Sequence, residues 1–195
     1  MAGGKSSRFG ENKALFPVRG VPMIERIIDI LKKYTEELFI VSNENSLYER
    51  FGLKIVGDEF PGLGPLAGLH AALKAASTKQ VLLVACDMPF LSDGLVAHLV
   101  TLGKEHPMVV PYGPKGPEPL LAIYPKGLIG AIEKRLRANR LSMRGLIEAH
   151  PHKRLSLKGL PQKLYPEVST LNINTKKELE KALSLYDKCV SNKTP

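Results

Sequence analysis

Residues 81–89 read Val-Leu-Leu-Val-Ala-Cys-Asp-Met-Pro, and they contain the clearest strand signal in the chain. The first five side chains are all apolar, which is typical of a strand buried on both faces of a mostly parallel sheet. Segments with helical and strand-like periodicity alternate on both sides of this stretch. The alternation predicts an α/β protein of Rossmann type, with an open, mostly parallel sheet between two layers of helices.

The predicted elements follow one another with short connections. Strands are expected at 38–41, 54–56, 81–85, 108–110 and 120–123. Helices are expected at 22–31, 64–76, 92–104 and 128–138, then from 142, and from 175 to about 186. No repeat or low-complexity linker interrupts them, so we expect one domain over residues 1–190 and a flexible tail at 191–195.

The composition limits the class of protein. Of the 195 residues, 44% are hydrophobic and 24% are charged, which is ordinary for a soluble globular protein. No apolar run is as long as a membrane helix, and no secretory leader follows Met1. The two cysteines, Cys86 and Cys189, are too few for a disulfide framework, and no zinc-type cluster occurs. We therefore expect a cytoplasmic protein with no membrane partner.

The net charge of +9 comes from the second half of the chain. Residues 1–100 hold 11 basic and 11 acidic side chains, whereas residues 101–195 hold 17 and 8. Between 134 and 163, Glu148 is the single acid among the basic residues Lys134, Arg135, Arg137, Arg140, Arg144, Lys153, Arg154, Lys158 and Lys163. Such a field attracts anionic ligands. A nucleic-acid-binding module is the distant alternative; no nucleic-acid partner is expected, because helix-turn-helix, zinc and aromatic-rich stacking patterns are all missing.

The amino-terminal segment, residues 1–13, reads MAGGKSSRFGENK. Its paired glycines, Gly3 and Gly4, leave backbone N–H groups open to a bulky anion. Three positive charges, on Lys5, Arg8 and Lys13, make the segment suitable for a triphosphate. Neither the Walker A spacing nor G-x-G-x-x-G occurs there, which disfavours a kinase-like or NAD-binding site. The alternative is a solvated, flexible terminus.

Only Met1 and Ala2 precede the paired glycines, although the first phosphate loop of such a fold follows a strand. The first strand is therefore expected to be truncated. A strand of about five residues would bury apolar side chains that contribute roughly 1.5–3 kcal/mol each, a sum comparable to the stability of a domain. We expect the biological chain to start upstream of Met1.

Candidate ligand-binding side chains follow the strand at 81–85 and recur near the carboxyl end. Asp87 lies just beyond that strand, where open α/β sheets bind ligands, and its carboxylate is a candidate Mg²⁺ ligand. The alternative for Asp87 is a cap on the helix that starts nearby. Asn172 and Asn174 share a face if residues 171–175 are extended, so either can coordinate the metal or its water shell. For Asn174 the alternative is again a helix cap.

Six motifs together carry a resemblance that spans nearly the whole chain. They are Ala2-Gly3-Gly4 with Arg8 and Lys13, Ser42-Asn43, Asp58, Gly64-Pro65-Leu66-Ala67-Gly68, Cys86-Asp87-Met88-Pro89 and Asn172-Ile173-Asn174-Thr175. In their order and spacing they resemble the molybdenum cofactor guanylyltransferase family, whose fold is of the nucleotide-diphospho-sugar transferase type. The opening signature, A-G-G-x-S-x-R-x-G-x-x-K, is long and therefore fairly specific for nucleotidyltransferases.

The resemblance implies transfer of GMP from Mg²⁺-GTP to the terminal phosphate of molybdopterin, giving the guanine dinucleotide cofactor and pyrophosphate. Mg²⁺ would be the cofactor, GTP and molybdopterin the ligands, and other molybdenum cofactor proteins transient partners. The amino-terminal half would bind the nucleotide and the carboxyl-terminal half the acceptor. The alternative is another nucleotidyltransferase of the same fold, one that uses CTP or acts on a sugar phosphate. The double glycine and the Gly-Pro-Leu-Ala-Gly loop favour the guanylyl branch.

The roles implied by the resemblance fall on three sets of residues. The catalytic residues would be Arg8, Lys13 and Asp87, of which Asp87 holds the metal and the two cations neutralise the departing pyrophosphate. The GTP-binding residues would be Ala2, Gly3, Gly4, Lys13, Asn43, Asp58, Gly68 and Asp87. The acceptor-binding residues would be Arg140, Arg144, Asn172 and Asn174. For the two arginines the alternative is a charged helix face that contacts only water.

Overall fold

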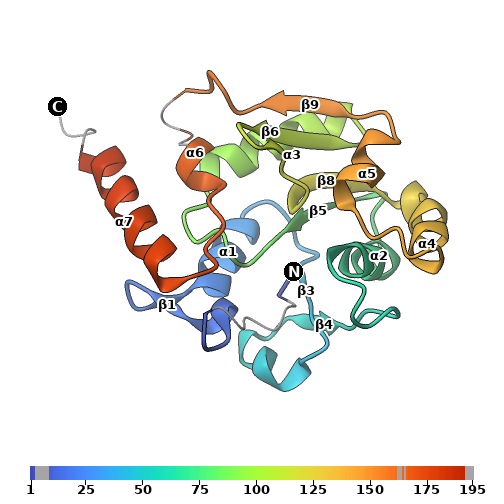
Figure 1. The fold of residues 1–195 in the computed structure, drawn as a ribbon, viewed down its shortest axis with the longest axis horizontal. Helices are drawn as coiled ribbons and strands as arrows, with labels where there is room; N and C mark the ends of the chain where they lie inside the picture. The colour runs from blue at the N-terminus through green and yellow to red at the C-terminus, as the bar shows by residue number, and fades with distance from the viewer. Residues whose placement is uncertain (3–8, 162–163, 165, 192–195) are drawn as a thin grey trace.

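The chain folds into strands at the centre of the molecule with helices around them (Figure 1). The computed structural model describes residues 1–2, 9–161, 164 and 166–191. The strands are β1 (Pro17–Val18), β2 (Val21–Pro22), β3 (Phe39–Val41), β4 (Lys54–Val56), β5 (Gln80–Val84), β6 (Val109–Gly113), β7 (Gly116–Pro117), β8 (Leu121–Pro125) and β9 (Lys153–Ser156). The helices are α1 (Met23–Leu31), α2 (Pro65–Ala75), α3 (Asp93–Glu105), α4 (Ile129–Arg137), α5 (Met143–Glu148), α6 (Pro166–Ser169) and α7 (Lys176–Ser191). In this described part of the chain, no helix is both long and apolar enough to span a membrane.

The main sheet is mixed because β8 runs against its neighbours. β8 lies between β5 and β6 and is antiparallel to both, with Leu121 opposite Val84. β9 pairs with β6 in parallel, and β3 pairs with β4 in parallel in a separate two-stranded sheet. β5, β6 and β9 therefore point in the same direction, so their carboxyl ends lie at one edge of the sheet. The predicted α/β fold is confirmed.

Alternate residues along the strands contribute to two separate cores. Leu83 and Ala122 are buried on the face that packs against α2, α4 and α5. Their chain neighbours Val84 and Ile123 are buried on the opposite face, with α1 and α3. Successive side chains of a strand point to opposite faces, so a strand covered on both sides has to be apolar throughout. This explains the unbroken apolar run at 81–85.

Met1 and Ala2 lie between the edges of β3 and β5. The Met1 ammonium donates to the carbonyl oxygen of Val84 (2.7 Å), and the N–H of Cys86 donates to the carbonyl oxygen of Met1 (3.1 Å). On the other side, the N–H of Ala2 donates to the carbonyl oxygen of Val41 (2.9 Å). These two residues thus bridge the edges of β3 and β5 by backbone hydrogen bonds. A cavity of about 160 Å³ adjoins Met1, lined by side chains of β3 and β5 and of the helices around them.

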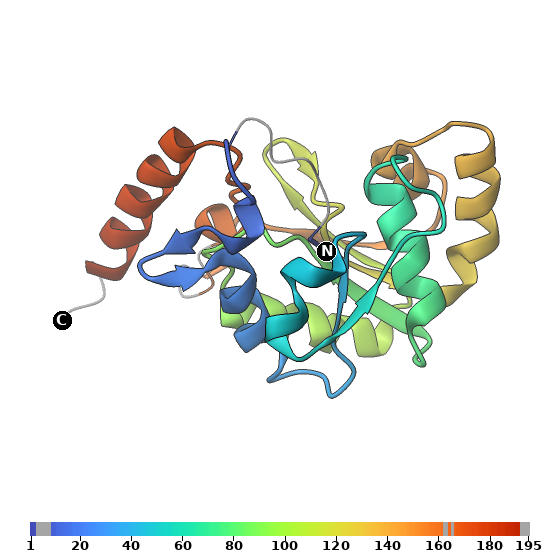
Figure 2. The ribbon, with the colours of Figure 1, turned by 90° about the horizontal axis from the view of Figure 1, so that it is seen from below.

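Helix α7 packs beside the β1–β2 hairpin, at the opposite end of the molecule from α4 (Figures 1 and 2). Leu179 of this helix is buried in one cluster with Val18 of the hairpin and Met23. Ile173, just before the helix, belongs to the same cluster and is 1% exposed. The segment that precedes α7 is therefore anchored beside the amino-terminal part of the chain.

Candidate active site

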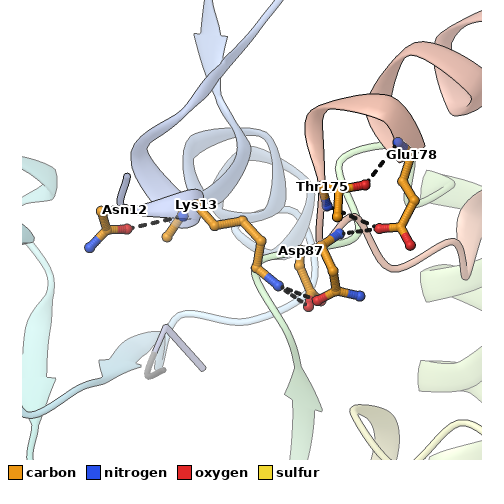
Figure 3. Close-up of polar contacts among 7 residues, drawn as sticks. Asn12, Lys13, Asp87, Thr175 and Glu178 are labelled. Carbon is orange, nitrogen blue, oxygen red and sulfur yellow. Dashed lines mark hydrogen bonds and ion pairs between the residues drawn. The ribbon is translucent and has the colours of Figure 1, made fainter. Parts of the chain in front are cut away.

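Three polar side chains from distant parts of the chain meet beyond the carboxyl end of β5 (Figure 3). Lys13 Nζ donates to Asp87 Oδ2 at 2.7 Å and to Asn174 Oδ1 at 2.9 Å. The side chains of Lys13 and Asp87 are only 16% and 15% exposed. Because little water screens this ion pair, the attraction between the two charges is stronger than in an exposed pair. The structure therefore brings together three of the residues that the sequence assigned to one site.

Lys13 is presented by a short turn with a side-chain cap. It is the first residue of the 3₁₀ turn Lys13–Leu15, and Asn12 Oδ1 accepts a hydrogen bond from the N–H of Ala14 (3.0 Å). Asn12 also donates to Tyr48 Oη (3.2 Å), which in turn donates to the carbonyl oxygen of Ala2 (2.9 Å). Asn12 supports the site but is not among the predicted site residues. Asparagine is a common helix cap, so its position before Lys13 is a signal that the sequence contains.

Asp87 is held through its own backbone. Its carbonyl oxygen accepts a hydrogen bond from the N–H of the buried Ile173 (2.9 Å). The N-cap of α3 is Ser92, so the alternative that Asp87 caps this helix is wrong. Asp87 Oδ1 is buried and has no hydrogen-bond partner among the described residues. Since an unpaired buried carboxylate oxygen is costly, this atom is a candidate ligand for a cation.

The residues at this point fit a hard divalent cation. Mg²⁺ in proteins is usually held by one or two carboxylates and keeps several of its waters. Asp87 Oδ1 offers one carboxylate oxygen, and Asn174 contributes a neutral oxygen to the same cluster. Across the described ranges there is no group of three or more His, Cys, Asp or Glu side chains that could hold a metal. Asp87 Oδ1 is thus a candidate ligand for such a cation.

Cys86, the neighbour of Asp87, adds no charge to the site. Burial raises the pKa of its thiol to about 11, so the thiol stays protonated at neutral pH. A buried, protonated thiol is a poor nucleophile because the thiolate is the reactive form. The arrangement gives no support to covalent catalysis by this cysteine.

Thr175 and Glu178 cap the amino-terminal end of α7. The N–H of Glu178 donates to Thr175 Oγ1 (3.1 Å), and Glu178 Oε2 accepts from the N–H groups of Thr175 (3.0 Å) and Asn174 (2.7 Å). The alternative that the Asn174 side chain caps this helix is therefore wrong, since that side chain contacts Lys13 instead. Glu178 is missing from the predicted site, although the Thr175-x-x-Glu178 spacing is a capping-box signal. Asn172 is exposed.

A second polar cluster lies at the carboxyl ends of β3 and β4. Asn43 Nδ2 donates to Asp58 Oδ2 (2.9 Å), and the backbone N–H of Asp58 donates to Asn43 Oδ1 (2.8 Å). The parallel pairing of β3 and β4 brings these two residues together. Asp58 Oδ1 is buried without a hydrogen-bond partner in the described structure. This oxygen is the second acceptor, after Asp87 Oδ1, that is suited to a ligand.

The predicted glycine and basic contacts to the nucleotide are only partly visible. Gly3, Gly4 and Arg8 lie outside the described residues. Ala2 is buried, with its backbone bonded to Val41 and Tyr48. A Cβ at Gly68 would lie 2.5 Å from Met1 Sδ, so a larger residue here would displace the flexible Met1 side chain. Its role toward the nucleotide stays a prediction.

The two predicted acceptor arginines lie in the α4–α5 region. Arg144 Nη2 donates to the carbonyl oxygen of Lys115 (2.8 Å), which ties α5 to the turn between β6 and β7. Arg140 is exposed in the connection between α4 and α5. No hydrogen bond or ion pair of the described residues joins either arginine to the cluster around Asp87. Their binding of the acceptor stays a prediction.

Comparison of the chain with known proteins shows the family to which it belongs. The family model described as the MobA-like NTP transferase domain matches residues 1–154. The chain belongs to this family. It is 35% identical over 191 residues to the probable molybdenum cofactor guanylyltransferase of Carboxydothermus hydrogenoformans, covering 95% of this chain and 94% of the relative. It is also 35% identical over 184 residues to the molybdenum cofactor guanylyltransferase of Desulfosudis oleivorans, covering 93% and 91%.

Solved structures of the same fold extend the likeness. The molybdopterin-guanine dinucleotide biosynthesis protein A of Archaeoglobus fulgidus superposes with a TM-score of 0.79 at 24% identity, covering 96% of both chains. The 2-C-methyl-D-erythritol 4-phosphate cytidylyltransferase of Thermus thermophilus superposes with a TM-score of 0.66 at 17% identity, covering 90% of this chain and 94% of the other. Family membership and fold identify the chain as a nucleotidyltransferase, which is an argument against the nucleic-acid-binding alternative.

Proposed function

We propose that this enzyme transfers GMP from Mg²⁺-GTP to the terminal phosphate of molybdopterin and releases pyrophosphate. The observation that carries the proposal is the contact of Lys13 with Asp87 and Asn174 at the end of β5, together with the unpartnered Oδ1 of Asp87. A cation that is mostly shielded from water and a carboxylate suited to Mg²⁺ are what a site for nucleotide phosphates needs. The relatives named as guanylyltransferases support the choice of reaction.

The proposed reaction requires positioning and charge stabilisation rather than a covalent intermediate. An oxygen of the acceptor phosphate attacks the α-phosphorus of GTP. The bond from that phosphorus to the bridging oxygen breaks, and pyrophosphate leaves with the electron pair. Lys13 binds the departing pyrophosphate and stabilises its developing charge. Asp87 would hold Mg²⁺, and the ion would supply further neutralisation of the phosphates.

Asp58 supports guanine as the base. The Watson–Crick edge of guanine carries two adjacent donors, N1–H and the 2-amino group, whereas that of cytosine carries one donor beside acceptors. An ionised carboxylate only accepts hydrogen bonds, so it complements the guanine edge. Asn43 is bonded to Asp58 Oδ2 and leaves Oδ1 for a ligand. The Asn43–Asp58 pair is thus our proposed base-recognition element.

The acceptor is proposed to bind on the other side of Lys13. Asn174 contacts Lys13 directly, and the basic second half of the chain attracts an anionic acceptor. We keep Asn172, Arg140 and Arg144 as acceptor-binding candidates and Gly3, Gly4, Arg8 and Gly68 as nucleotide-binding candidates. The proposed reaction takes place in the cytoplasm, and its product is handed on through transient contact with other molybdenum cofactor proteins.

Nucleotide choice is tested by thermal-shift titration with GTP, CTP, ATP and UTP in the presence of Mg²⁺. The expected result is a clear preference for GTP in binding. In a separate turnover assay with Mg²⁺-GTP, pyrophosphate should be released only when molybdopterin is added. A preference for CTP would instead make the enzyme a cytidylyltransferase of the same fold. Pyrophosphate release with a sugar phosphate but not with molybdopterin would overturn the proposal that molybdopterin is the acceptor.

A further inference from the structure

Glu178 does more at the amino-terminal end of α7 than a helix cap requires. A cap has to satisfy the first N–H groups of the helix, and the reciprocal bonds between Thr175 and Glu178 do so. The same carboxylate oxygen also accepts from the N–H of Asn174 at 2.7 Å, the shortest of the three bonds (Figure 3). Asn174 lies before the helix, and its side chain contacts Lys13. Glu178 therefore acts on a residue of the proposed site.

The segment with Asn174 is fixed at two points. On one side, the N–H of Ile173 bonds to the carbonyl oxygen of Asp87 (2.9 Å), and the Ile173 side chain is buried. On the other side, Glu178 holds the N–H of Asn174. Between these two points the direction of the Asn174 side chain is set by the backbone. Its oxygen accordingly meets Lys13 Nζ at 2.9 Å.

We propose that Glu178 is a positioning residue for nucleotidyl transfer, which holds Asn174 so that Lys13 stays aligned with Asp87. The proposal rests on the proposed function. Glu178 itself is exposed, and its carboxylate is linked to Lys13 through Asn174. Without Glu178, the N–H groups of Asn174 and Thr175 lose their acceptor and the turn relaxes. Lys13 then loses the contact with Asn174 Oδ1 that helps to orient it.

The variant Glu178→Ala removes both backbone contacts, whereas Glu178→Gln keeps a carbonyl oxygen that can accept them. We expect Glu178→Ala to lower kcat by about 10- to 100-fold, the usual effect of losing a residue that orients a ligating group. Glu178→Gln should recover most of this loss. Glu180→Ala removes the same charge from an exposed position of the same helix and should leave kcat unchanged.

The variant Thr175→Val tests whether Glu178 affects turnover by positioning Asn174 or only by stabilising the helix cap. This variant loses the bond from the N–H of Glu178 but keeps the N–H groups that Glu178 binds. It should lower the Tm about as much as Glu178→Ala while retaining most of the turnover. In the double variant Asn174→Ala/Glu178→Ala, the second change should cause no further loss of kcat, because Glu178 acts through Asn174. Equal losses of kcat in Thr175→Val and Glu178→Ala, or additive losses in the double variant, would overturn the proposal.

The role of Glu178 is also tested without turnover. Hydrogen exchange at the amides of Asn174 and Thr175, and calorimetric titration with Mg²⁺-GTP, need no acceptor. Faster exchange and weaker nucleotide binding in Glu178→Ala, both restored in Glu178→Gln, support positioning even if molybdopterin proves not to be the acceptor. Unchanged exchange and unchanged binding in Glu178→Ala would overturn it, whatever the fate of the proposed function.

Discussion

Lys13 Nζ lies 2.7 Å from Asp87 Oδ2, so the carboxylate that we propose as the Mg²⁺ ligand is paired with an ammonium group of the chain itself. Both side chains are mostly shielded from water, and each charge stabilises the other. A divalent cation would bind Asp87 Oδ1, which has no hydrogen-bond partner among the described residues, while Lys13 pairs with Oδ2 of the same carboxylate. The like charge of Lys13 nearby would weaken that binding until phosphate oxygens neutralise both cations.

Asp87→Asn should reduce kcat by roughly 10²- to 10³-fold, because a group aimed at charge in the transition state is lost. The amide keeps the shape of the side chain, so the circular dichroism spectrum should stay that of the wild type. The matched control is Asp93→Asn, which breaks the exposed Lys33–Asp93 ion pair and should leave kcat unchanged. A fully active Asp87→Asn enzyme would remove Asp87 from the mechanism.

Lys13→Met should bind Mg²⁺ more tightly in the absence of nucleotide and yet turn over more slowly. A unit charge about 4 Å away contributes on the order of 4 kcal/mol at an effective dielectric of 20, so we expect at least a tenfold gain in Mg²⁺ affinity by calorimetry. Turnover falls because the cation for pyrophosphate is lost. Lys33→Met is the control for loss of an ion-paired lysine at an exposed site. Mg²⁺ binding that is unchanged or weakened by Lys13→Met contradicts the expected charge repulsion.

Asp58→Asn should weaken the preference for GTP over CTP by roughly tenfold or more, because a hydrogen bond to a charged acceptor contributes about 1.5–3 kcal/mol. The measurement is the ratio of the two dissociation constants in the presence of Mg²⁺. Glu59→Gln is the matched control, since Glu59 is the next acid in the chain and pairs with the exposed Lys74. If Asp58→Asn alters both constants equally, Asp58 does not recognise the base.

An apolar extension of about five residues ahead of Met1 should raise the Tm. Its backbone would continue the hydrogen bonds that Met1 makes to β5, and its side chains would fill the cavity beside Met1. Burial contributes about 0.8 kcal/mol per CH₂ group, so several buried side chains give a gain of several kcal/mol. A Gly-Ser extension of equal length is the control and should give no such gain. Equal Tm values for the two extensions would show that the cavity does not accept a strand.

The extension should also change how the stability of the protein depends on pH. Burial lowers the pKa of the Met1 ammonium below 8.0, so the folded chain binds this proton less readily than the unfolded chain. For protein that starts at Met1, stability should therefore rise as the pH increases toward 8 and level off above it. The apolar extension converts this amine into an amide, so the corresponding part of the pH dependence should disappear.

The strand at 81–85 and the position of Asp87 at its end are predictable from sequence because their signals are local. An unbroken apolar run marks a strand covered on both faces, and a polar residue at its end marks the ligand edge. The meeting of Lys13 and Asn174 at Asp87 depends on contacts between distant residues. The direction of β8 is not predictable in this way. Leu121 and its neighbours are apolar in either direction, and only the three-dimensional pairing makes β8 antiparallel to β5 and β6.

Contacts between distant residues account for most of what the sequence leaves open. Arg144 belongs to a basic stretch that suggests an anion site, yet its guanidinium bonds to the backbone of Lys115. Both Asn174 and Thr175 are suitable caps for α7 by sequence. In the structure the Asn174 side chain contacts the distant Lys13, and Thr175 caps the helix. The capping contact between Glu178 and Thr175, by contrast, is predictable from the local Thr-x-x-Glu spacing.

The central claim is GMP transfer to a phosphate acceptor, and isotope labelling tests it most directly. With Mg²⁺ and molybdopterin, GTP labelled at the α-phosphorus should pass its label into a dinucleotide product, and GTP labelled at the γ-phosphorus should pass its label into pyrophosphate. Asp87→Asn should slow both transfers by the same roughly 10²- to 10³-fold. Label from the γ-phosphorus in the acceptor, or α-label that stays in free nucleotide while the acceptor is unchanged, would contradict the account.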